Sequence, residues 1–326
     1  MKDSVKIFPL IGLTVSLLLT SCSSEVNYSR SLFNHIPADP EVLVLIRPND
    51  VTNLLEITMD ELDLNKLFDD RLGIDTSDFN RQKEIVGEML QAVGVPWPQV
   101  ESVGFLLYFE KPIILLSGNF KQQEVVARIR EVGFKQRSNG YFDYIYEKQK
   151  LHVPADGLMM MAEEDLLDFL MLVPEENRLW NREDFEAYRR TTPLNNSIFL
   201  WSQPPKHFLS DFQYHEELSN VSVAVDFKHN LNMRANVRLK SSEKATYLYD
   251  MVLGTVTFSQ GMFGPDPEFG PVFKGIKVTQ DNNQVIASLV IPASQLPALK
   301  ERIMRDIENP EAGTFGKLQN FFDRLD

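Results

Sequence analysis

The sequence predicts an α+β protein with mostly antiparallel sheets and helices packed on one face. Strand-like apolar runs come in neighbouring pairs joined by short turns, which is the pattern of antiparallel hairpins. Segments with the apolar spacing of a helix follow these pairs, as helices do when they cover a sheet. Residues 231–239 carry the clearest pattern, because apolar side chains alternate there with Asn and Arg. One face of that strand is therefore expected to be apolar and the other wet.

The first predicted strand covers residues 41–48. It ends at Pro48, and Asn49 or Asp50 is expected to cap the helix that follows. A second helix is expected over residues 81–93, where apolar side chains recur four residues apart.

The first hairpin is predicted from residues 103–109 and 112–118, with its turn at Glu110 and Lys111. Both of its strands are apolar at odd and at even positions, so we expect this hairpin to be buried on both faces. The elements expected after it are a helix over 121–132, with Asn119 as its cap and Gln122 three residues on, strands over 141–146, 150–153 and 157–161, and a helix over 163–172.

A second hairpin begins at residue 221, and the same order of elements follows it. The expected elements are strands 221–227 and 231–240, a helix from 242 to about 258, strands 275–279 and 284–291, and a helix over 295–307. Hairpin, helix, strands, helix thus occurs twice. We therefore predict two pattern-level repeats, residues 36–195 and residues 196–326.

Charge and cysteine content exclude several classes of function. The formal net charge of −13 over 326 residues argues against a nucleic-acid partner, whose phosphates require clustered Lys and Arg. It also argues against direct docking on anionic lipid headgroups. The single cysteine, Cys22, excludes an internal disulfide, a C-x-x-C redox pair and a thiolate metal cage.

The N-terminus has the pattern of a secretory signal peptide. Two lysines, Lys2 and Lys6, precede the uncharged residues 7–19, which Pro9 interrupts. A helix over that stretch would rise about 20 Å, which is too short for the hydrocarbon core of a bilayer. We therefore expect residues 1–21 to be a signal peptide.

The four residues Leu19-Thr20-Ser21-Cys22 resemble the lipobox of bacterial lipoproteins. The resemblance implies cleavage before Cys22 and fatty acylation of it, for example by palmitate; the alternative is an ordinary secretory signal with an incidental cysteine. Two or three acyl chains on one residue anchor a protein stably. Residues 22–35 would then form a lipidated tether. By resemblance, Ser23 in the second mature position favours the outer membrane, facing the periplasm, over the inner membrane.

The stretch "HIPADPEVLVLIRPNDVTNLLE", residues 35–56, follows the tether. It is similar to the start of lipoprotein families of Bacteroidota that open with Ile-Pro-Ala-Asp, a hydrophobic strand and a short helix. The resemblance implies a body of repeated strand and helix modules, and it implies no catalytic site.

Common catalytic signatures, including G-x-S-x-G, H-E-x-x-H and the P-loop, are absent from the sequence. No catalytic residue, metal ligand or cofactor is therefore predicted. For "HEE" at residues 215–217, a solvated turn is favoured over a metal or acid-base site. The acidic residues 60–78 lack the register of a calcium loop, so a solvated loop is favoured there.

Four aromatic residues are candidates for ligand binding. Tyr144 and Tyr146 share one side of a predicted strand, where they stack a sugar, line an apolar cleft or occupy a half-exposed sheet face. Phe263 and Phe269 lie in the Gly- and Pro-rich residues 258–275, which we predict to be an irregular loop. That loop either closes over an apolar ligand or plugs the end of the sheet.

The sequence favours a non-enzymatic, lipid-anchored envelope protein that binds another envelope protein or an apolar ligand. The alternatives are a periplasmic carrier of an apolar ligand, a hydrolase without a recognisable motif, and a purely structural role. A deep apolar cavity would favour the carrier, and a cleft with converging titratable groups would favour the enzyme. A filled interior with one exposed apolar patch would favour a protein partner.

Overall fold

The computed structural model divides into two compact units. One, here the β1–β7 unit, contains residues 30–50 and 81–203; the other, the β8–β11 unit, contains residues 51–55, 77–80 and those from 215 onward. The predicted signal peptide and Cys22 lie outside the described residues. The structure describes residues 30–55, 77–109, 111–144, 148–191, 196–203, 215–227, 230–267, 269–298 and 301.

The boundary between the units differs from the predicted boundary of the repeats. The division falls after residue 203 and not after residue 195. Strand β7 (Ile198–Ser202) pairs along its whole length with β1 (Val42–Ile46), so it belongs with the first unit.

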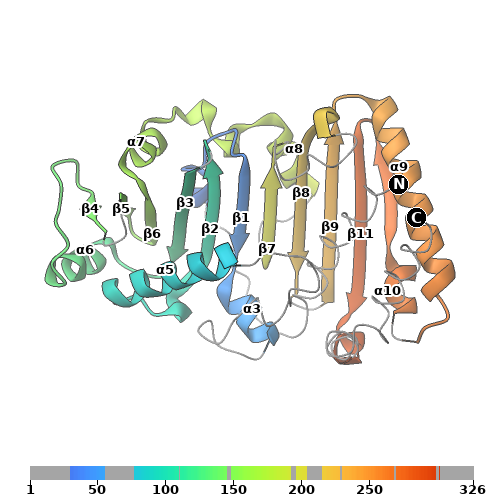
Figure 1. Ribbon diagram of the computed structural model, residues 1–326, viewed down its shortest axis with the longest axis horizontal. Helices are drawn as coiled ribbons and strands as arrows, with labels where there is room; N and C mark the ends of the chain where they lie inside the picture. The colour runs from blue at the N-terminus through green and yellow to red at the C-terminus, as the bar shows by residue number, and fades with distance from the viewer. Residues whose placement is uncertain are drawn as a thin grey trace. The chain divides into compact units, whose positions relative to one another are not determined.

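The sheet of the β1–β7 unit is antiparallel throughout, in the order β7-β1-β2-β3-β6-β5-β4 (Figure 1). The strands not yet given are β2 (Val100–Tyr108), β3 (Lys111–Gly118), β4 (Phe142–Asp143), β5 (Gln149–Ala155) and β6 (Leu158–Glu163).

The β2–β3 hairpin is buried on both faces, as predicted. Ile113 and Leu115 join one apolar core, and Ile114 and Leu116 join a second core on the opposite side of the strand. Its turn lies one residue earlier than predicted, because Tyr108 pairs with Lys111 and only two residues separate them.

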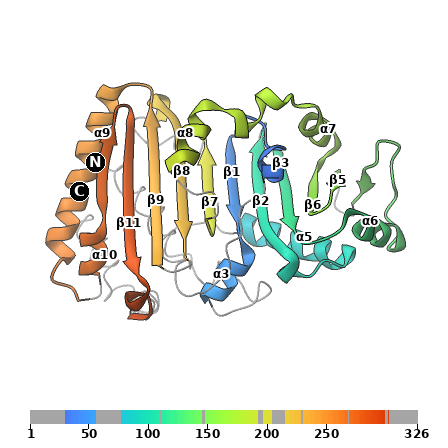
Figure 2. The ribbon, with the colours of Figure 1, turned by 180° about the vertical axis from the view of Figure 1, so that it is seen from behind.

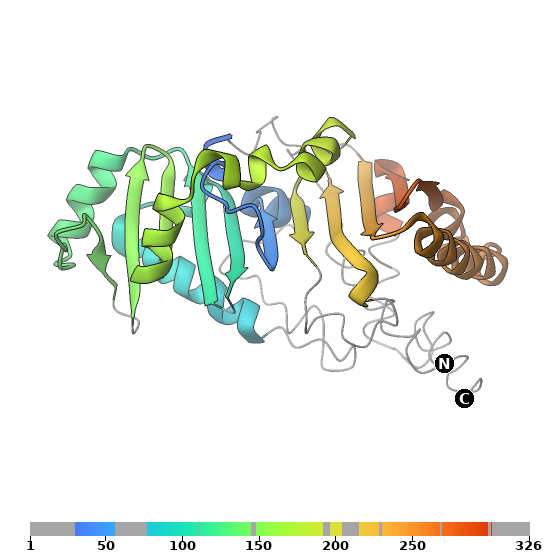
Figure 3. The ribbon, with the colours of Figure 1, turned by 90° about the horizontal axis from the view of Figure 1, so that it is seen from above.

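Helices cover both faces of this sheet, as Figure 3 shows. The prediction of helices on one face is therefore wrong for this unit, because its central hairpin is apolar on both sides and needs cover on both. One core lies under α5 and α6 and the other under α2, α7 and α8. The bounds are α2 (Arg30–Phe33), α5 (Ser77–Val93), α6 (Gln122–Glu131), α7 (Glu164–Leu172) and α8 (Glu183–Thr191). Neither α8 nor β7 was predicted from the sequence. A further helix, α3 (Pro48–Leu55), begins two residues after β1.

The β8–β11 unit has the antiparallel order β10-β11-β9-β8 (Figure 2). Its elements are β8 (Leu218–Asp226), β9 (Asn230–Leu239), α9 (Ser242–Phe263), α10 (Gly270–Gly275), β10 (Lys277–Asp281) and β11 (Gln284–Pro292). Helix α9 packs Ala245 and Leu248 on the apolar face that Leu239 and Val285 present. Here the helix lies on one face of its sheet, as expected.

The opposite, polar face of β9 is only partly wet. Asn236 is 2 % exposed and pairs across the strands with Ser222, which is fully buried. Burial along β9 does not alternate strictly either, because Leu231 and Leu239 are buried whereas Met233, Ala235 and Val237 are only partly buried. The prediction of one apolar face and one wet face is therefore wrong over the middle of β9.

The α+β class with antiparallel strands is confirmed. In both units a hairpin, a helix and a second hairpin give the same strand order, β2-β3-β6-β5 and β8-β9-β11-β10. This agreement concerns topology, and a duplication in the chain stays a prediction. Among the described residues, no helix is long and apolar enough to span a membrane. Most of the helix predicted over 295–307 lies outside them.

Candidate functional site

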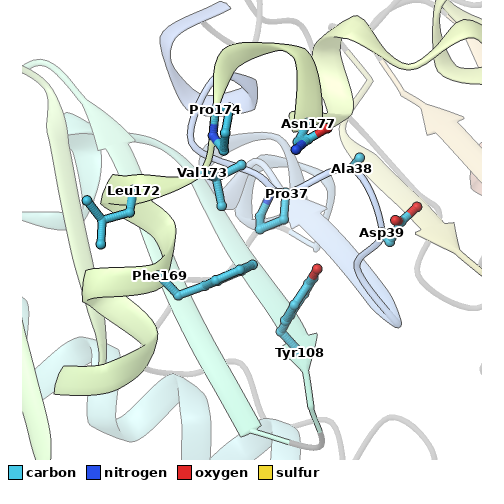
Figure 4. Close-up of a pocket in the computed structure, with 9 residues that line it drawn as sticks. All are labelled: Pro37, Ala38, Asp39, Tyr108, Phe169, Leu172, Val173, Pro174 and Asn177. Carbon is cyan, nitrogen blue, oxygen red and sulfur yellow. The ribbon is translucent and has the colours of Figure 1, made fainter.

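An open hollow of about 420 Å³ lies in the β1–β7 unit (Figure 4). Three segments line it: the residues before β1, the end of β2, and the end of α7 with the loop that follows it. Pro37 and Val173 form its apolar floor, and Tyr108 and Phe169 reach into it from β2 and α7. Asn177 and Asp39 supply polar groups at the edge. The lining is therefore mixed, with rings on one side and polar groups on the other.

Apolar side chains continue from the hollow onto the surface. Leu172, at the end of α7, is 79 % exposed, Phe109 is 67 % exposed and Met171 is 39 % exposed. Tyr108, Phe109 and Phe169 form a ring cluster, in which Tyr108 lies 4.7 Å from Phe109 and 5.0 Å from Phe169 between centroids. We call Tyr108, Phe109, Phe169, Met171 and Leu172, with the hollow beside them, the aromatic surface.

Phe109 occupies a strained position in the tight turn between β2 and β3. Its φ is 52°, in the left-handed region that bulky residues avoid. Two-residue hairpin turns favour Gly, Asn or Asp at such positions because these residues adopt positive φ at low cost. Phenylalanine at this position strains the backbone and exposes an apolar ring to solvent. The needs of folding alone therefore do not explain why this residue is a phenylalanine. Backbone strain of this kind concentrates at binding sites.

Carboxylates flank the ring cluster. Burial raises the pKa of the Tyr108 hydroxyl, and the negative charges of Asp39 and Glu41 raise that pKa further. The phenol therefore stays protonated at neutral pH and is available as a hydrogen-bond donor. Asp39 accepts hydrogen bonds from Arg182 and, at 3.0 Å, from Gln203.

Lys111 links the hairpin to α7. Its ammonium group donates to Glu163 at 2.6 Å and to Asp165 at 3.0 Å. These two bonds raise the pKa of Lys111, and the bond from Lys111 lowers the pKa of Asp165. The bond to Asp165 is exposed and the bond to Glu163 is partly buried, so we assign the two pairs a role in orienting the turn and little stability.

The predicted candidates Tyr144 and Tyr146 lie elsewhere. Tyr144 is 6 % exposed and packs edge-on against Phe134 in the core below α5 and α6. Tyr146 lies outside the described residues. The expected half-exposed strip is wrong for Tyr144, whose ring is a core side chain, and a ligand role for the pair stays a prediction.

Phe263 and Phe269 are also buried, and the irregular loop predicted over residues 258–275 is wrong. Helix α9 continues to Phe263, and α10 begins at Gly270. The ring of Phe273 stacks on Phe263 at 5.0 Å and lies 6.5 Å from Phe269. This packing favours the plug at the end of the sheet over a loop that closes on a ligand.

Tyr141, Asp168 and His152 form a polar cluster between α7 and the sheet. The Tyr141 hydroxyl donates to Asp168 at 2.8 Å, and the His152 ring lies 4.8 Å from the Tyr141 ring. Burial and the bond to Asp168 raise the pKa of Tyr141 to about 12. Burial lowers the pKa of His152, and the charge of His35 lowers it further. In the described part of the chain, no three His, Cys, Asp or Glu side chains are grouped to hold a metal.

His152 is expected to make the β1–β7 unit less stable as the pH falls. Its native pKa lies below the unfolded value of about 6.5, so unfolding takes up a proton at acidic pH. The stability that the neutral ring contributes is complete above about pH 6.5 and is lost as the pH falls towards the native pKa. Tyr141 and His35 are the titratable groups that act on it.

The measurement is the difference in unfolding free energy between wild type and His152→Phe at a series of pH values. Carboxylates titrate alike in both proteins and cancel in the difference. As the pH falls from about 7 to about 5, the unfolding free energy of the variant should rise relative to that of the wild type. A difference that does not vary with pH would show that His152 is not coupled to folding.

Replacing Phe109 by Asn is expected to leave the protein at least as stable as wild type. The strain of a bulky residue at positive φ, about 1–2 kcal/mol, is relieved, and this offsets the lost ring contacts. The same substitution at Phe169 is the control, because that residue lies in a helix and is half-buried. Thermal melts should show no decrease for Phe109→Asn and a clear decrease for Phe169→Asn. Equal decreases would contradict the assignment of strain to Phe109.

Sequence reasoning missed the aromatic surface because its residues come from three distant segments. The one local signal was Phe109, a bulky aromatic residue beside the turn predicted at Glu110 and Lys111.

No protein-family model and no curated protein matches this chain. Solved structures that resemble it include crystal forms III, IV and I of TP0453. Form III has a TM-score of 0.45 at 10% identity and covers 83% of this chain and 98% of that one. Form IV has a TM-score of 0.44 at 10% identity, with 82% and 95% covered, and form I has 0.43 at 11% identity, with 85% and 99% covered. At these values the resemblance is a weak one of chain arrangement and carries no argument about function.

Proposed function

We propose that this protein is a lipid-anchored protein of the cell envelope whose β1–β7 unit binds a protein partner through the aromatic surface. The anchoring half of the proposal rests on the lipobox-like residues 19–22 and the basic, apolar segment before them. Acyl chains on Cys22 would attach the chain to a membrane without a spanning helix. The tether would then hold the folded units close to that membrane, with the outer membrane favoured by Ser23.

The proposal of a binding site rests on one observation. Phe109 and Leu172 are exposed beside the hollow, while the interior of the unit is well packed. Two cores fill the two sides of the sheet with fully buried side chains such as Leu43, Leu115 and Ile129. Of the four exposed large apolar residues described in this unit, by contrast, Phe109, Met171 and Leu172 belong to the aromatic surface, and the fourth, Val132, lies at the end of α6. Exposed apolar patches of this kind are typical of protein interaction sites. A filled interior with such a patch matches the pattern expected for a protein partner.

Carriage of a small apolar ligand is the second candidate. The hollow, at about 420 Å³, falls within the usual size range of ligand pockets. Its open shape and its polar edge support this candidate less than they support a partner that covers the rings from outside.

Two measurements on protein purified in detergent from its native envelope test the proposal. Mass spectrometry of the peptide that begins at Cys22 should show acyl chains on it, and an unmodified thiol would contradict the anchoring. Quantitative mass spectrometry of co-purifying proteins and lipids should show a protein whose recovery falls in Phe109→Asn and stays unchanged in Tyr247→Asn. Tyr247 is a matched control because it is an exposed aromatic residue of the other unit. Equal recovery of every co-purifying protein with the wild type, Phe109→Asn and Tyr247→Asn would contradict the binding site. If Phe109→Asn instead loses a small apolar molecule that co-purifies with the wild type, carriage would be favoured.

A further inference from the structure

We propose that the partner's binding segment is a polypeptide with lysine or arginine beside an apolar anchor. This inference rests on the proposed function and concerns the chemistry of the partner. It comes from the charges that surround the aromatic surface.

Six carboxylates border the surface on the hollow side and along α7. Asp39 lines the hollow, and its charge, like that of Glu41, acts on the Tyr108 hydroxyl. Two more lie on the same helix as Phe169 and Leu172, and the last two lie between the lining residues Pro174 and Asn177. The six residues are Asp39, Glu41, Asp165, Asp168, Glu175 and Glu176.

Five of these carboxylates are exposed, and Glu41 is partly buried. The side chain of Asp39 is 67 % accessible and that of Asp165 is 68 % accessible. Glu175 and Glu176 are exposed as well. Solvated charges of this kind can pair with a partner at a low desolvation cost.

The basic side chains beside them are already engaged within the unit. Lys111 bonds to Glu163 and Asp165, and Arg182 bonds to Asp39 and, at 2.6 Å, to Asp184. Arg178 donates from Nε and Nη2 to the carbonyl of Val173, at 3.2 and 3.1 Å. Among the described residues named here, these three cations stand beside eight carboxylates, because Glu163 and Asp184 add to the six. The border keeps a negative potential, which attracts cations and repels anions.

The combination of charge and shape selects the class of partner. A membrane surface rich in anionic lipid would be repelled by this border. A small neutral ligand would fill the hollow and leave both the charged border and the exposed Phe109 and Leu172 unused. A polypeptide segment can place one apolar side chain in the hollow, against the packed rings of Tyr108 and Phe169. The aliphatic part of a neighbouring Lys or Arg can then cover Phe109, while its charged end reaches the carboxylates.

The experiment measures binding of three labelled peptides to the full-length chain by fluorescence anisotropy. All three carry Leu and Phe at the centre, and their flanking residues are lysines, serines or glutamates. The lysine peptide should bind about tenfold more tightly than the serine peptide, and the glutamate peptide most weakly. The affinity of the lysine peptide should fall steeply as the salt concentration rises from about 0.05 to about 0.5 M. The double variant Glu175→Gln with Glu176→Gln, at two exposed positions, should weaken only the lysine peptide, while Phe109→Asn should weaken all three.

Equal binding of the three peptides, still sensitive to Phe109→Asn, would overturn the inference and leave the proposed function standing. Binding of the lysine peptide that Phe109→Asn does not change would overturn both, because the carboxylates alone would then be responsible. Anionic phospholipid vesicles provide the remaining arm. If they bind the chain through the aromatic surface and lose binding in Phe109→Asn, the partner is a membrane and the inference is wrong.

Discussion

Replacing Asp50 by Ala is expected to destabilise the β1–β7 unit by about 3–5 kcal/mol. The Asp50 carboxylate lies 2.9 Å from Nη1 of Arg47, with the two side chains 2 % and 6 % exposed. It also accepts a hydrogen bond from the Ser197 hydroxyl at 2.8 Å. Removing the carboxylate leaves the Arg47 charge buried without this counter-charge, and an uncompensated buried charge is costly.

The loss is measured by urea unfolding, with tryptophan fluorescence as the signal. This signal reports on the β1–β7 unit, because all three tryptophans, Trp97, Trp180 and Trp201, belong to it. Asp50→Asn should also destabilise, since the amide keeps the shape and loses the charge. The double replacement Arg47→Met with Asp50→Leu should recover most of the loss, because the buried charge is then gone. A loss below about 1 kcal/mol in Asp50→Ala would mean that the pair is hydrated, as surface pairs are.

Replacing Trp201 by Ala is expected to cost about 3–5 kcal/mol, the usual range for deleting a large buried ring. Trp201 is 1 % exposed and lies in the core between the sheet and α8. Its ring packs edge-on against Phe185 at 5.2 Å and lies 5.8 Å from Tyr188. Alanine would remove these contacts and leave a cavity.

Replacing Trp201 by Phe is expected to cost much less than Trp201→Ala. The indole Nε1 is buried and makes no hydrogen bond in the structure. Phenylalanine keeps most of the ring contacts and removes this unsatisfied donor, so the two effects offset each other. Thermal melts monitored by circular dichroism compare the two variants directly. Similar losses for both would show that the indole N–H has a solvent partner that stabilises the fold.

Periodicity predicted the strands well where it was strong. The β2–β3 hairpin and β9 lie within a few residues of their predicted bounds, because continuous or alternating apolar runs specify strands directly. Short elements without such runs were missed: β7 has five residues, and α8 carries three acidic side chains in its first turn and little apolar character. Glycine and proline between residues 258 and 275 suggested a loop, but the helix continued because tertiary packing of Phe263 and Phe273 outweighed local preference.

Two further local predictions failed for identifiable reasons. Asn49 or Asp50 was expected to cap α3, but Pro48 opens the helix, a position that suits proline. Asp50 turns inward to Arg47, and the side-chain amide of Asn49 donates to the carbonyls of Pro98 and Val100. Asn119 with Gln122 is the usual capping pattern for α6, yet the N–H of Gln122 donates to Asp156 at 2.9 Å. In both cases the partner that decides the local structure lies in another element or points into the core. The aromatic surface is hard to predict for the same reason, since α7 reaches Tyr108 only through the pairing of β3 with β6.

The central claim is that the aromatic surface is covered by a protein partner in the envelope. It is tested most directly by placing a photo-crosslinking amino acid at Leu172 in cells, with the same amino acid at Tyr247 as the control. Both positions are exposed, and they belong to different units. After irradiation we expect one discrete protein adduct from position 172, absent from position 247 and lost when Phe109→Asn is added. No adduct at position 172, or the same adducts from both positions, would contradict the claim.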